Sequence, residues 1–453
     1  MAKDDNRKGE HRKRRAGRKA ALRRDSARTH KHTAESESGS RPGYGLAFHV
    51  LIFLIAFLLV FWRRTDAVLH AQFWAEDGKY WYHDAYQFGF RPLLRPQDGY
   101  LQTASRLAAL LSLALPFRLA PLVLNLCAIT IQIVPANMFL SSRYSELSIR
   151  TRALGGFLYL AIPNSYEIDA NVTNLQWHLG LLACLVLLAQ PARYWQWRMF
   201  DGAALVLVSL QSMMGVLLLP IAAFLWWRRR EGWRWAIPFA VLVPGAAIET
   251  LSVLLSQSRE HRIIGASLPR FVTILGRQIF LPAVLGSRTV LDILSSQSAA
   301  MMFSMEAIAA AVGVVILLFA LRYGPTELRL FILFAFAVFA LCLIWPVGAR
   351  IGWQQWRALP VPGSSNRYYF LPIIAFLASL VWLAFDPAVS RNFRCAGVVV
   401  LLLLPIGIYQ DWYYPAFKNF HFPKYAAQFE RAPSGTHFTI PINPDWTMEL
   451  TKR

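Results

Sequence analysis

Charged residues are scarce in this 453-residue sequence: Asp, Glu, Lys and Arg make up 16% of it, whereas 55% of the residues are hydrophobic. So low a charged fraction excludes a soluble protein of several domains. Acidic residues are especially few, and the net charge is +21. Because the basic residues gather in the N-terminal tail and in short loops between apolar runs, they indicate membrane topology and not a nucleic-acid partner. We predict a polytopic membrane protein.

Cysteine is nearly absent as well. Four cysteines lie far apart, in or at the ends of apolar runs and without CxxC or Cys/His spacing, at Cys127, Cys184, Cys342 and Cys395. This pattern excludes a disulfide framework and a zinc site, and it predicts small buried apolar side chains. Residues 1–42 almost lack large apolar side chains. They cannot offset the loss of chain entropy, so we expect a disordered basic cytoplasmic tail.

Apolar runs of helical length are abundant. Together with the Arg and Lys residues of the connecting loops, they predict an all-α domain over residues 43–410 with about eleven transmembrane helices, its N-terminus inside and its C-terminus outside. Residues 101–117 are apolar but interrupted by Arg106, and they predict an interfacial helix. A single re-entrant hairpin is an alternative for the two short runs within 202–227. The predicted spans are 46–62, 119–140, 153–163, 177–189, 202–211, 215–227, 236–255, 299–321, 330–345, 370–385 and 396–409.

Polar chemistry concentrates on the predicted outer face, whereas the inner loops are short and basic. The first extracytoplasmic loop is expected over residues 63–104, and residues 411–453 form the C-terminal segment. This segment includes a strand-like piece at 436–442 and is too short for a hydrophobic core of its own. We therefore expect it to pack on the outer loops as an extracytoplasmic cap.

An acidic pair stands in the stretch Phe73–Trp81, FWAEDGKYW, shortly after the first predicted span. Glu76 and Asp77 lie among aromatic residues at the point where the chain would leave the bilayer. Aromatic rings favour that depth and carboxylates do not. The pair is therefore a candidate site for cation or sugar chemistry. The alternative is an interfacial aromatic belt with solvated acids.

The arrangement resembles the membrane-integral glycosyltransferases of the C superfamily (GT-C), and most of all an uncharacterised bacterial branch of it. The shared features are the acidic pair of the first outer loop, the interfacial helix, the many spans, and the Arg367-Tyr368 pair before Pro372. The C-terminal residues Ile440–Trp446 match no catalytic motif of that superfamily. The resemblance implies transfer of a sugar from a polyprenyl-phosphate carrier to a cell-envelope acceptor, on the outer face of a bacterial inner membrane.

The resemblance also implies roles for single residues. Asp77 stands where the superfamily has its first-loop catalytic acid, which would act as the base that an acceptor hydroxyl needs; Glu76 is the adjacent acid. Arg367, with Tyr368 beside it, would bind the carrier phosphate, because arginine matches phosphate oxygens. Arg106 and Arg262 are weaker candidates. Asp77 as a loop acid or a helix N-cap, and Arg367 as an interfacial anchor, remain alternatives.

Other outer-face residues are candidate contacts to the acceptor or the sugar: Trp74, Asp98, Tyr100, Glu167, Asn174 and His178. For the cluster between Glu167 and His178, a lining of hydrogen-bonded loop residues is the alternative. The acids and the histidine there lack a compact ligand spacing, so we predict no metal ligands, although a divalent cation stays open. The expected partners are a polyprenyl-phosphate-linked sugar and membrane lipid.

Two other classes of function remain open. A lipid or polysaccharide flippase would also be polytopic, but it would usually show internal repeats, which this sequence does not display. A non-catalytic envelope-assembly protein has little need for an acid pair and a phosphate-matching arginine on one face. Glu249 and Glu306 lie within predicted spans, where an acid is a functional candidate by default.

Overall fold

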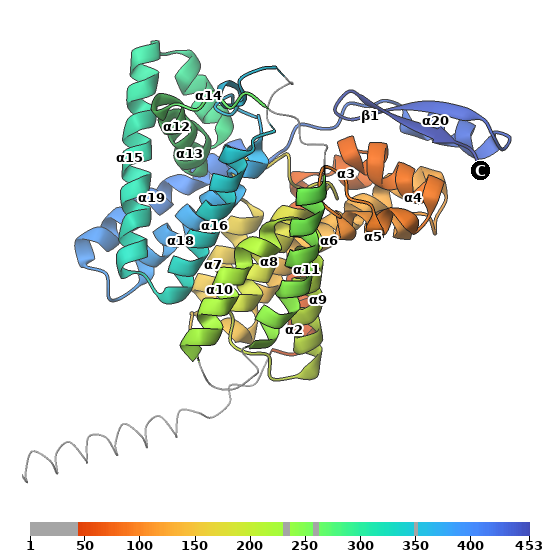
Figure 1. The fold of residues 1–453 in the computed structure, drawn as a ribbon. Coiled ribbons are helices and arrows are strands. Elements are labelled where there is room, and N and C mark those ends of the chain that lie inside the picture. Colours follow the sequence, from red (N-terminus) through yellow and green to blue (C-terminus); the bar gives the residue numbers. More distant parts are fainter. Residues whose placement is uncertain (1–43, 230–235, 257–261, 348–351) are drawn as a thin grey trace, which may run out of the picture. The chain divides into compact units, whose positions relative to one another are not determined.

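The computed structural model describes residues 44–229, 236–256, 262–347 and 352–453. The predicted disordered tail, residues 1–42, lies outside these ranges. The chain divides into a unit that ends at Gly45 and a unit from Leu46 to Arg453. Everything below concerns the second unit, which is drawn in Figure 1.

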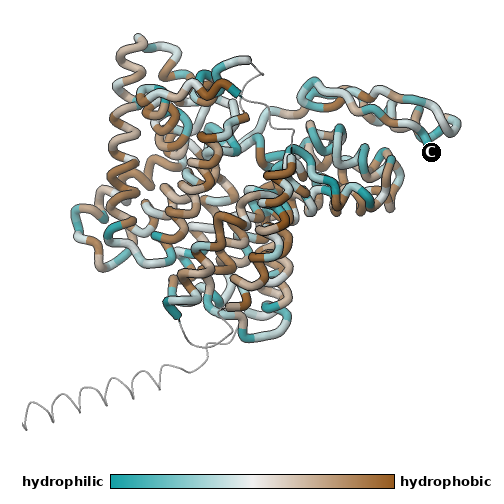
Figure 2. The backbone as a smooth tube through the Cα atoms, viewed as in Figure 1, coloured by the Kyte–Doolittle hydropathy of each residue, from teal (hydrophilic) through white to brown (hydrophobic). Residues whose placement is uncertain are grey.

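Eleven helices of the described part overlap the eleven predicted spans. Six of them, together with the segment Leu268–Leu285, are long and apolar enough to cross a membrane, which confirms the predicted all-α polytopic membrane fold. Apolar residues dominate these helices, and polar residues concentrate in the connections (Figure 2). Two of them, α8 and α18, are shorter apolar helices of 14 and 16 residues. The helices are α2 (Leu46–Arg63), α6 (Ala120–Leu140), α7 (Ile149–Leu160), α8 (Leu175–Leu188), α9 (Trp195–Ser209), α10 (Met214–Arg229), α11 (Ala236–Leu255), α15 (Ala299–Tyr323), α16 (Thr326–Ile344), α18 (Phe370–Phe385) and α19 (Arg391–Gln410).

The two faces are built differently. One, here called the basic face, has short connections joined by arginines: Arg143 donates to the Gln190 carbonyl and pairs with Asp201, and Arg228 donates to Thr326. The opposite one, here called the loop face, carries the long connections 63–119, 161–174, 262–298 and 345–369 together with residues 411–453. That the loop face is extracytoplasmic stays a prediction.

A twelfth long apolar segment does not cross between the faces. Residues Leu268–Leu285 form α12 (Leu268–Ile274), the π-helix η6 (Leu275–Phe280) and α13 (Leu281–Leu285), and they are long and apolar enough for a span. Nevertheless, Gln278 in the middle donates to the carbonyl groups of Leu359 and Val361 on the loop face. The next residue after Gly286, Ser287, donates to Asp411 on the same face. The segment therefore begins and ends on the loop face.

Several predicted boundaries need correction. The two short runs within 202–227 form the helices α9 and α10, of 15 and 16 residues, and the re-entrant hairpin stays a prediction for this pair. Helix α9 begins at Trp195, earlier than predicted. Its residue Asp201 forms an ion pair with Arg143. The predicted interfacial helix 101–117 is shorter, spanning Thr103–Ser112 as α5. The four cysteines are free, but only Cys184 is buried: Cys127 and Cys342 are half-buried, and Cys395 of α19 is exposed.

Short elements complete the loop face. The first loop contains α3 (Asp66–Leu69), the π-helix η1 (Asp77–Tyr82), α4 (His83–Phe88) and η2 (Arg91–Leu94), followed by α5 and by η3 (Phe117–Leu119). The later connections carry α14 (Ser287–Ser295), α17 (Gln355–Ala358) and η7 (Asn366–Tyr368). On the basic face, η4 spans Ser142–Tyr144.

The C-terminal segment folds as α20 (Phe422–Arg431) and a two-stranded antiparallel sheet, β1 (His437–Ile442) paired with β2 (Trp446–Thr451) (Figure 1). The strand-like piece predicted at 436–442 is thus a strand. Buried side chains of the hairpin, Ile440 and Met448 among them, face a core that includes Phe429 of α20. The turn between the strands reaches the first loop, where Asn443 accepts from the Ala75 amide at 2.5 Å and donates to the Phe73 carbonyl at 3.2 Å. Residues 411–453 therefore pack on the first loop.

Two side chains join the ends of several helices at the loop face. Arg63, the last residue of α2, donates to the carbonyl oxygens of Leu160 at 2.6 Å and Ile162 at 2.9 Å, both at the end of α7. Asp411, directly after α19, accepts from the amides of Asn164 at 3.0 Å and Ser287 at 2.7 Å. A buried carboxylate with several amide donors stabilises more than a neutral hydrogen bond does.

We predict that Asp411→Asn lowers the free energy of unfolding by roughly 2 to 3 kcal/mol, since an amide NH₂ would then face backbone N–H donors. The measurement is the unfolding temperature of the purified protein in detergent. Asp445→Asn is the matched control, because Asp445 is 69% exposed and pairs with an exposed lysine. Equal effects of the two substitutions would contradict the prediction.

Candidate functional site

The Asp77 carboxylate is buried against the turn that precedes α8. Its Oδ1 accepts from the Thr173 amide at 2.8 Å and from the Thr173 hydroxyl at 2.6 Å, and its Oδ2 accepts from the Val172 amide at 3.2 Å. Only 1% of Asp77 is exposed. The interpretation as an N-cap of its own helix is wrong: this side chain makes no cap hydrogen bond to η1 and instead ties the first loop to the 161–174 loop.

Burial raises the pKa of the Asp77 carboxyl to about 7, although the hydrogen bonds from Thr173 and Val172 favour the charged form. The carboxyl group therefore titrates close to neutral pH. Both oxygens are already occupied by donors of the protein, so in this structure the predicted base is held in place by the fold rather than presented to a substrate.

Glu76, the neighbour of Asp77, faces a different environment. It is half-buried, and burial raises the pKa of its carboxyl group. The positive charge of Arg367 opposes this rise, whereas the negative charges of Glu167 and Asp98 add to it. These four residues come from three loops of the loop face. They are called the acid–arginine cluster below: Glu76, Asp98, Glu167 and Arg367.

The centre of the cluster is an ion pair between Arg367 of η7 and Glu167 of the 161–174 loop. The Arg367 amide also donates to Glu167 Oε2 at 3.3 Å, and Nη2 donates to the Val347 carbonyl at 2.8 Å. The guanidinium carbon lies 5.0 Å from the centre of the Tyr368 ring. Burial alone would lower the pKa of Arg367, but Glu167, Tyr368 and Glu76 together outweigh it and raise the pKa. The arginine is therefore a permanent cation with a 25% exposed side chain.

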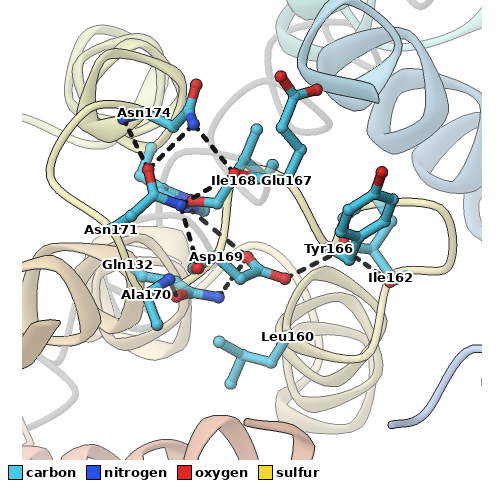
Figure 3. A network of polar contacts seen from close by, with 12 residues as sticks. Gln132, Leu160, Ile162, Tyr166, Glu167, Ile168, Asp169, Ala170, Asn171 and Asn174 are labelled. Atoms are coloured by element: carbon cyan, nitrogen blue, oxygen red, sulfur yellow. Dashed lines mark hydrogen bonds and ion pairs between the residues drawn. The ribbon is translucent and has the colours of Figure 1, made fainter. Parts of the chain in front are cut away.

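The 161–174 loop holds Glu167 in place through its own amides (Figure 3). The side-chain amides of Asn171 and Asn174 each donate to the Glu167 carbonyl at 2.9 Å, and the Asn174 amide donates to Asn171 Oδ1 at 3.1 Å. Figure 3 shows the Glu167 carboxylate pointing away from this network. Asn174, predicted as a sugar contact, is buried and positions the loop.

His178 has a similar structural role. It is 1% exposed, its Nδ1 lies 2.9 Å from the Tyr159 hydroxyl, and its Nε2 lies 3.2 Å from the Ile168 carbonyl. Asp169, nearby, accepts from Gln132 at 2.6 Å and from Ser165 at 3.1 Å. The alternative of a hydrogen-bonded loop lining describes this cluster. Within the described ranges, no group of three His, Cys, Asp or Glu residues is placed to hold a metal ion.

Arg106 does not lie free for an anionic headgroup, so its prediction as a phosphate ligand is wrong. It is 2% exposed and pairs with Asp84 at 3.0 Å. It also donates to the carbonyl groups of Leu101 and Arg95, both at 3.1 Å, and its guanidinium carbon lies 5.1 Å from the Trp81 ring centre. A buried arginine with all these partners fixes the shape of the first loop.

The remaining predicted contacts are placed apart from one another. Trp74 stacks on Phe417 of the C-terminal segment, with ring centres 5.1 Å apart, so this ring face is occupied by the protein. Tyr100 forms a backbone bridge with Gln97, with hydrogen bonds of 2.8 and 3.0 Å, and this bridge turns the chain at Asp98. Arg262 is half-buried in the segment before α12.

Glu249 and Glu306, the two acids singled out within the predicted spans, both have partners. Glu249 of α11 accepts from the Leu101 amide at 3.2 Å, just after the turn that carries Asp98. Glu306 of α15 forms an ion pair with Arg277 of η6. The sequence pattern had assigned no role to Arg277. These contacts tie α11 to the first loop and α15 to the 268–285 segment.

Some residues of the site carried no usable signal in the sequence. Thr173 and Val172 stood only within the Asn-Val-Thr triplet, and nothing marked them as partners of Asp77. Trp177 lies 6.2 Å from Tyr368 between ring centres, and both rings are buried. A tryptophan at a helix start is common at membrane interfaces, so its position beside Arg367 could only come from the fold.

No protein-family model matches the sequence, and no curated protein matches it. The fold is similar to solved structures of an oligosaccharyltransferase from Archaeoglobus fulgidus. One holds a tethered acceptor peptide with the NVT sequon: TM-score 0.42, 12% identity, covering 86% of this chain and 58% of that chain. Another, AglB with an inhibitory peptide and a dolichol-phosphate, gives TM-score 0.37 and 11% identity, covering 85% of this chain and 58% of that chain. The chain thus covers less than two thirds of the length of those chains.

The raised pKa of Asp77 predicts a pH dependence of stability. Between about pH 4, near which an unfolded aspartate titrates, and about pH 7, only the folded state keeps this proton. Stability should therefore fall as the pH rises through this window and level off above it. Unfolding temperatures measured from pH 4 to 8 should show this fall in the wild type and a flatter curve in Asp77→Asn.

Asp84→Asn is the matched control for this measurement. Burial raises the pKa of Asp84, but hydrogen bonds from His83 and Arg106 outweigh it, and the pKa is lowered. Its stabilising effect is present above about pH 4 and is lost in more acidic solution. Curves for wild type and Asp77→Asn that run parallel from pH 4 to 7 would contradict the pH prediction.

Proposed function

We propose that this integral membrane protein transfers a glycosyl group from a polyprenyl-phosphate carrier to a hydroxyl group of a cell-envelope acceptor at the loop face. The observation that carries the proposal is the acid–arginine cluster. It sets a half-buried carboxyl group with a raised pKa close to an arginine, on the membrane protein face that carries the long loops. An alcohol acceptor needs a base, and a departing lipid phosphate needs a positive charge.

Glu76 is our choice for the base, with Asp77 as the residue that holds it in place. The sequence pattern favours Asp77, but three hydrogen bonds from Thr173 and Val172 occupy its carboxylate. No side chain in the described ranges donates a hydrogen bond to Glu76, and the charges of Arg367 and Glu167 act on its carboxyl group. A carboxyl group whose pKa is raised toward neutrality is a more effective base than an ordinary one.

Arg367 is proposed to bind the carrier phosphate. It is permanently charged, and a quarter of its side chain is exposed. In the structure its guanidinium group pairs with Glu167, so a phosphate would share or replace this partner. Glu167 then keeps the arginine oriented in the absence of substrate, and Val347 and Tyr368 fix its other side. No divalent cation is assigned to this step.

The proposed location is a bacterial inner membrane with the loop face outward. The basic loops of the opposite face support this orientation, because arginine and lysine favour the cytoplasmic side. The resemblance of the first-loop acid pair to the GT-C glycosyltransferases supports the reaction class and the bacterial membrane. The proposed partners are a polyprenyl-phosphate-linked sugar and the surrounding lipid.

Substitution of the two acids separates their roles. We expect Glu76→Gln to lower the turnover of a polyprenyl-phosphate sugar by about 10² to 10⁴ without changing the unfolding temperature, because only the base is lost. Asp77→Asn should change the unfolding temperature as well as turnover. The measurement is release of free polyprenyl phosphate by purified protein in lipid, over a panel of donor sugars and extract-derived acceptors.

Each outcome of that assay has a meaning. Equal turnover by wild type and Glu76→Gln removes Glu76 from the chemistry. If Asp77→Asn folds normally but alone loses turnover, the base is Asp77. If the wild type consumes no donor in the panel, the transferase proposal fails, and lipid movement by a flippase is the next function to assay.

Arg367 and Glu167 make a second, independent prediction. Arg367→Lys should raise KM for the donor about tenfold, because a lysine lacks the two-pronged match to a phosphate. Glu167→Gln should lower KM several-fold, because it releases the arginine from a competing anion. Arg91→Lys, an exposed arginine of the first loop, is the control. KM values unchanged in both variants would exclude a phosphate at Arg367.

A further inference from the structure

A groove of about 450 Å³ lies between the first loop and the C-terminal segment, apart from the acid–arginine cluster. Its walls come from η1 and α4, from the connection between α5 and α6, and from the ends of α20 and β2. The residues on which the argument depends are Tyr86, Leu115, Phe117, Glu430, Lys452 and Arg453. None of them has a part in the proposed transfer.

The position of the groove in the chain sets its depth in a membrane. Phe117 forms part of its wall, and the apolar membrane segment Phe117–Leu140 begins at this residue. A cavity at the first turn of a membrane-crossing helix lies at the height of the lipid headgroups. Helix α5 leads to the groove with Leu107 and Leu111 exposed one turn apart, and Leu115, just after the end of this helix, is 48% exposed. This row of leucines suits contact with acyl chains.

The open side of the groove is basic. Lys452 and Arg453 follow β2, and no carboxylate in the described ranges lies within ion-pair distance of either one. Lys452 Nζ donates to the Glu430 carbonyl at 3.5 Å and lies 5.0 Å from the Phe429 ring centre, and the Arg453 guanidinium carbon lies 5.7 Å from the ring centre of Tyr86. The one acid of the wall, Glu430, accepts from the Arg118 amide at 3.1 Å. Two cations without acidic partners favour an anionic ligand.

We propose that this groove binds the headgroup of an anionic glycerophospholipid of the surrounding leaflet. Lys452 and Arg453 contact the phosphate, the tyrosine and phenylalanine rings line the glycerol region, and the acyl chains follow Leu111 and Leu115. The bound lipid joins the C-terminal segment to the membrane beside the first loop. The proposal does not depend on glycosyl transfer.

The test is native mass spectrometry of the full-length protein, released from detergent micelles that contain phosphatidylglycerol and phosphatidylcholine in equal amounts. The wild type should retain phosphatidylglycerol preferentially. The double variant Lys452→Gln/Arg453→Gln should retain it about tenfold less, because each charge near the membrane surface contributes to binding. Leu113→Trp, which fills the groove and keeps both charges, should lose it as well.

The control is Arg391→Gln/Arg394→Gln, which removes two positive charges from the start of α19 on the basic face. It should retain phosphatidylglycerol as the wild type does, and all variants should share the wild-type unfolding temperature in detergent. Equal retention by the wild type and both groove variants would overturn the proposal. So would preferential retention of added polyprenyl phosphate that both groove variants lose, because the groove would then serve the carrier lipid.

Discussion

The buried carboxylate of Asp77 is the constraint on which the rest of the loop face depends. It accepts hydrogen bonds from Val172 and Thr173, which follow it by 95 and 96 residues in the chain, and so it joins two loops. One of these loops carries Glu76, and the other carries Glu167. With the two loops tied, a negative charge from each lies near Arg367, which comes from a third connection. The carboxylate is costly to bury, as its raised pKa shows, and this cost is offset by three donors that would otherwise lack a partner.

In other connections, arginine side chains join segments that are distant in the chain. Arg63 and Arg106 are nearly inaccessible, yet each finds carbonyl oxygens at chain ends or turns where no helix satisfies them. A guanidinium group has five donors in one plane, so it can join several such carbonyl groups at once. Both arginines are therefore parts of the scaffold. Arg367 differs from them because its side chain remains 25% exposed beside its partner Glu167.

Much of the fold could be predicted from the sequence, because a membrane-crossing helix is a local property. Ala236–Leu255 and Phe370–Phe385 match their predicted ranges, and each of the other predicted spans overlaps a helix. The segment Leu268–Leu285 shows the limit, since it has the composition of a span but has both ends on one face. The site was predictable only in part. The sequence marked Glu76, Asp77 and Arg367, but which acid faces the arginine depends on Thr173 and Glu167, and contacts between distant loops leave no periodic pattern.

The different environments of the neighbouring acids Glu76 and Asp77 follow from helix geometry. Adjacent residues on a helix or a tight turn point in directions about 100° apart, so two consecutive side chains cannot both face one cavity. At Glu76-Asp77 one carboxylate enters the protein and meets backbone amides, and the other is half-buried within the field of Arg367. Burial of the first sets the orientation of the second, and it places a like charge next to it whenever Asp77 is ionised. The two acids of such a pair are therefore not equivalent: one is a buried part of the scaffold, and the other stays accessible at the loop face.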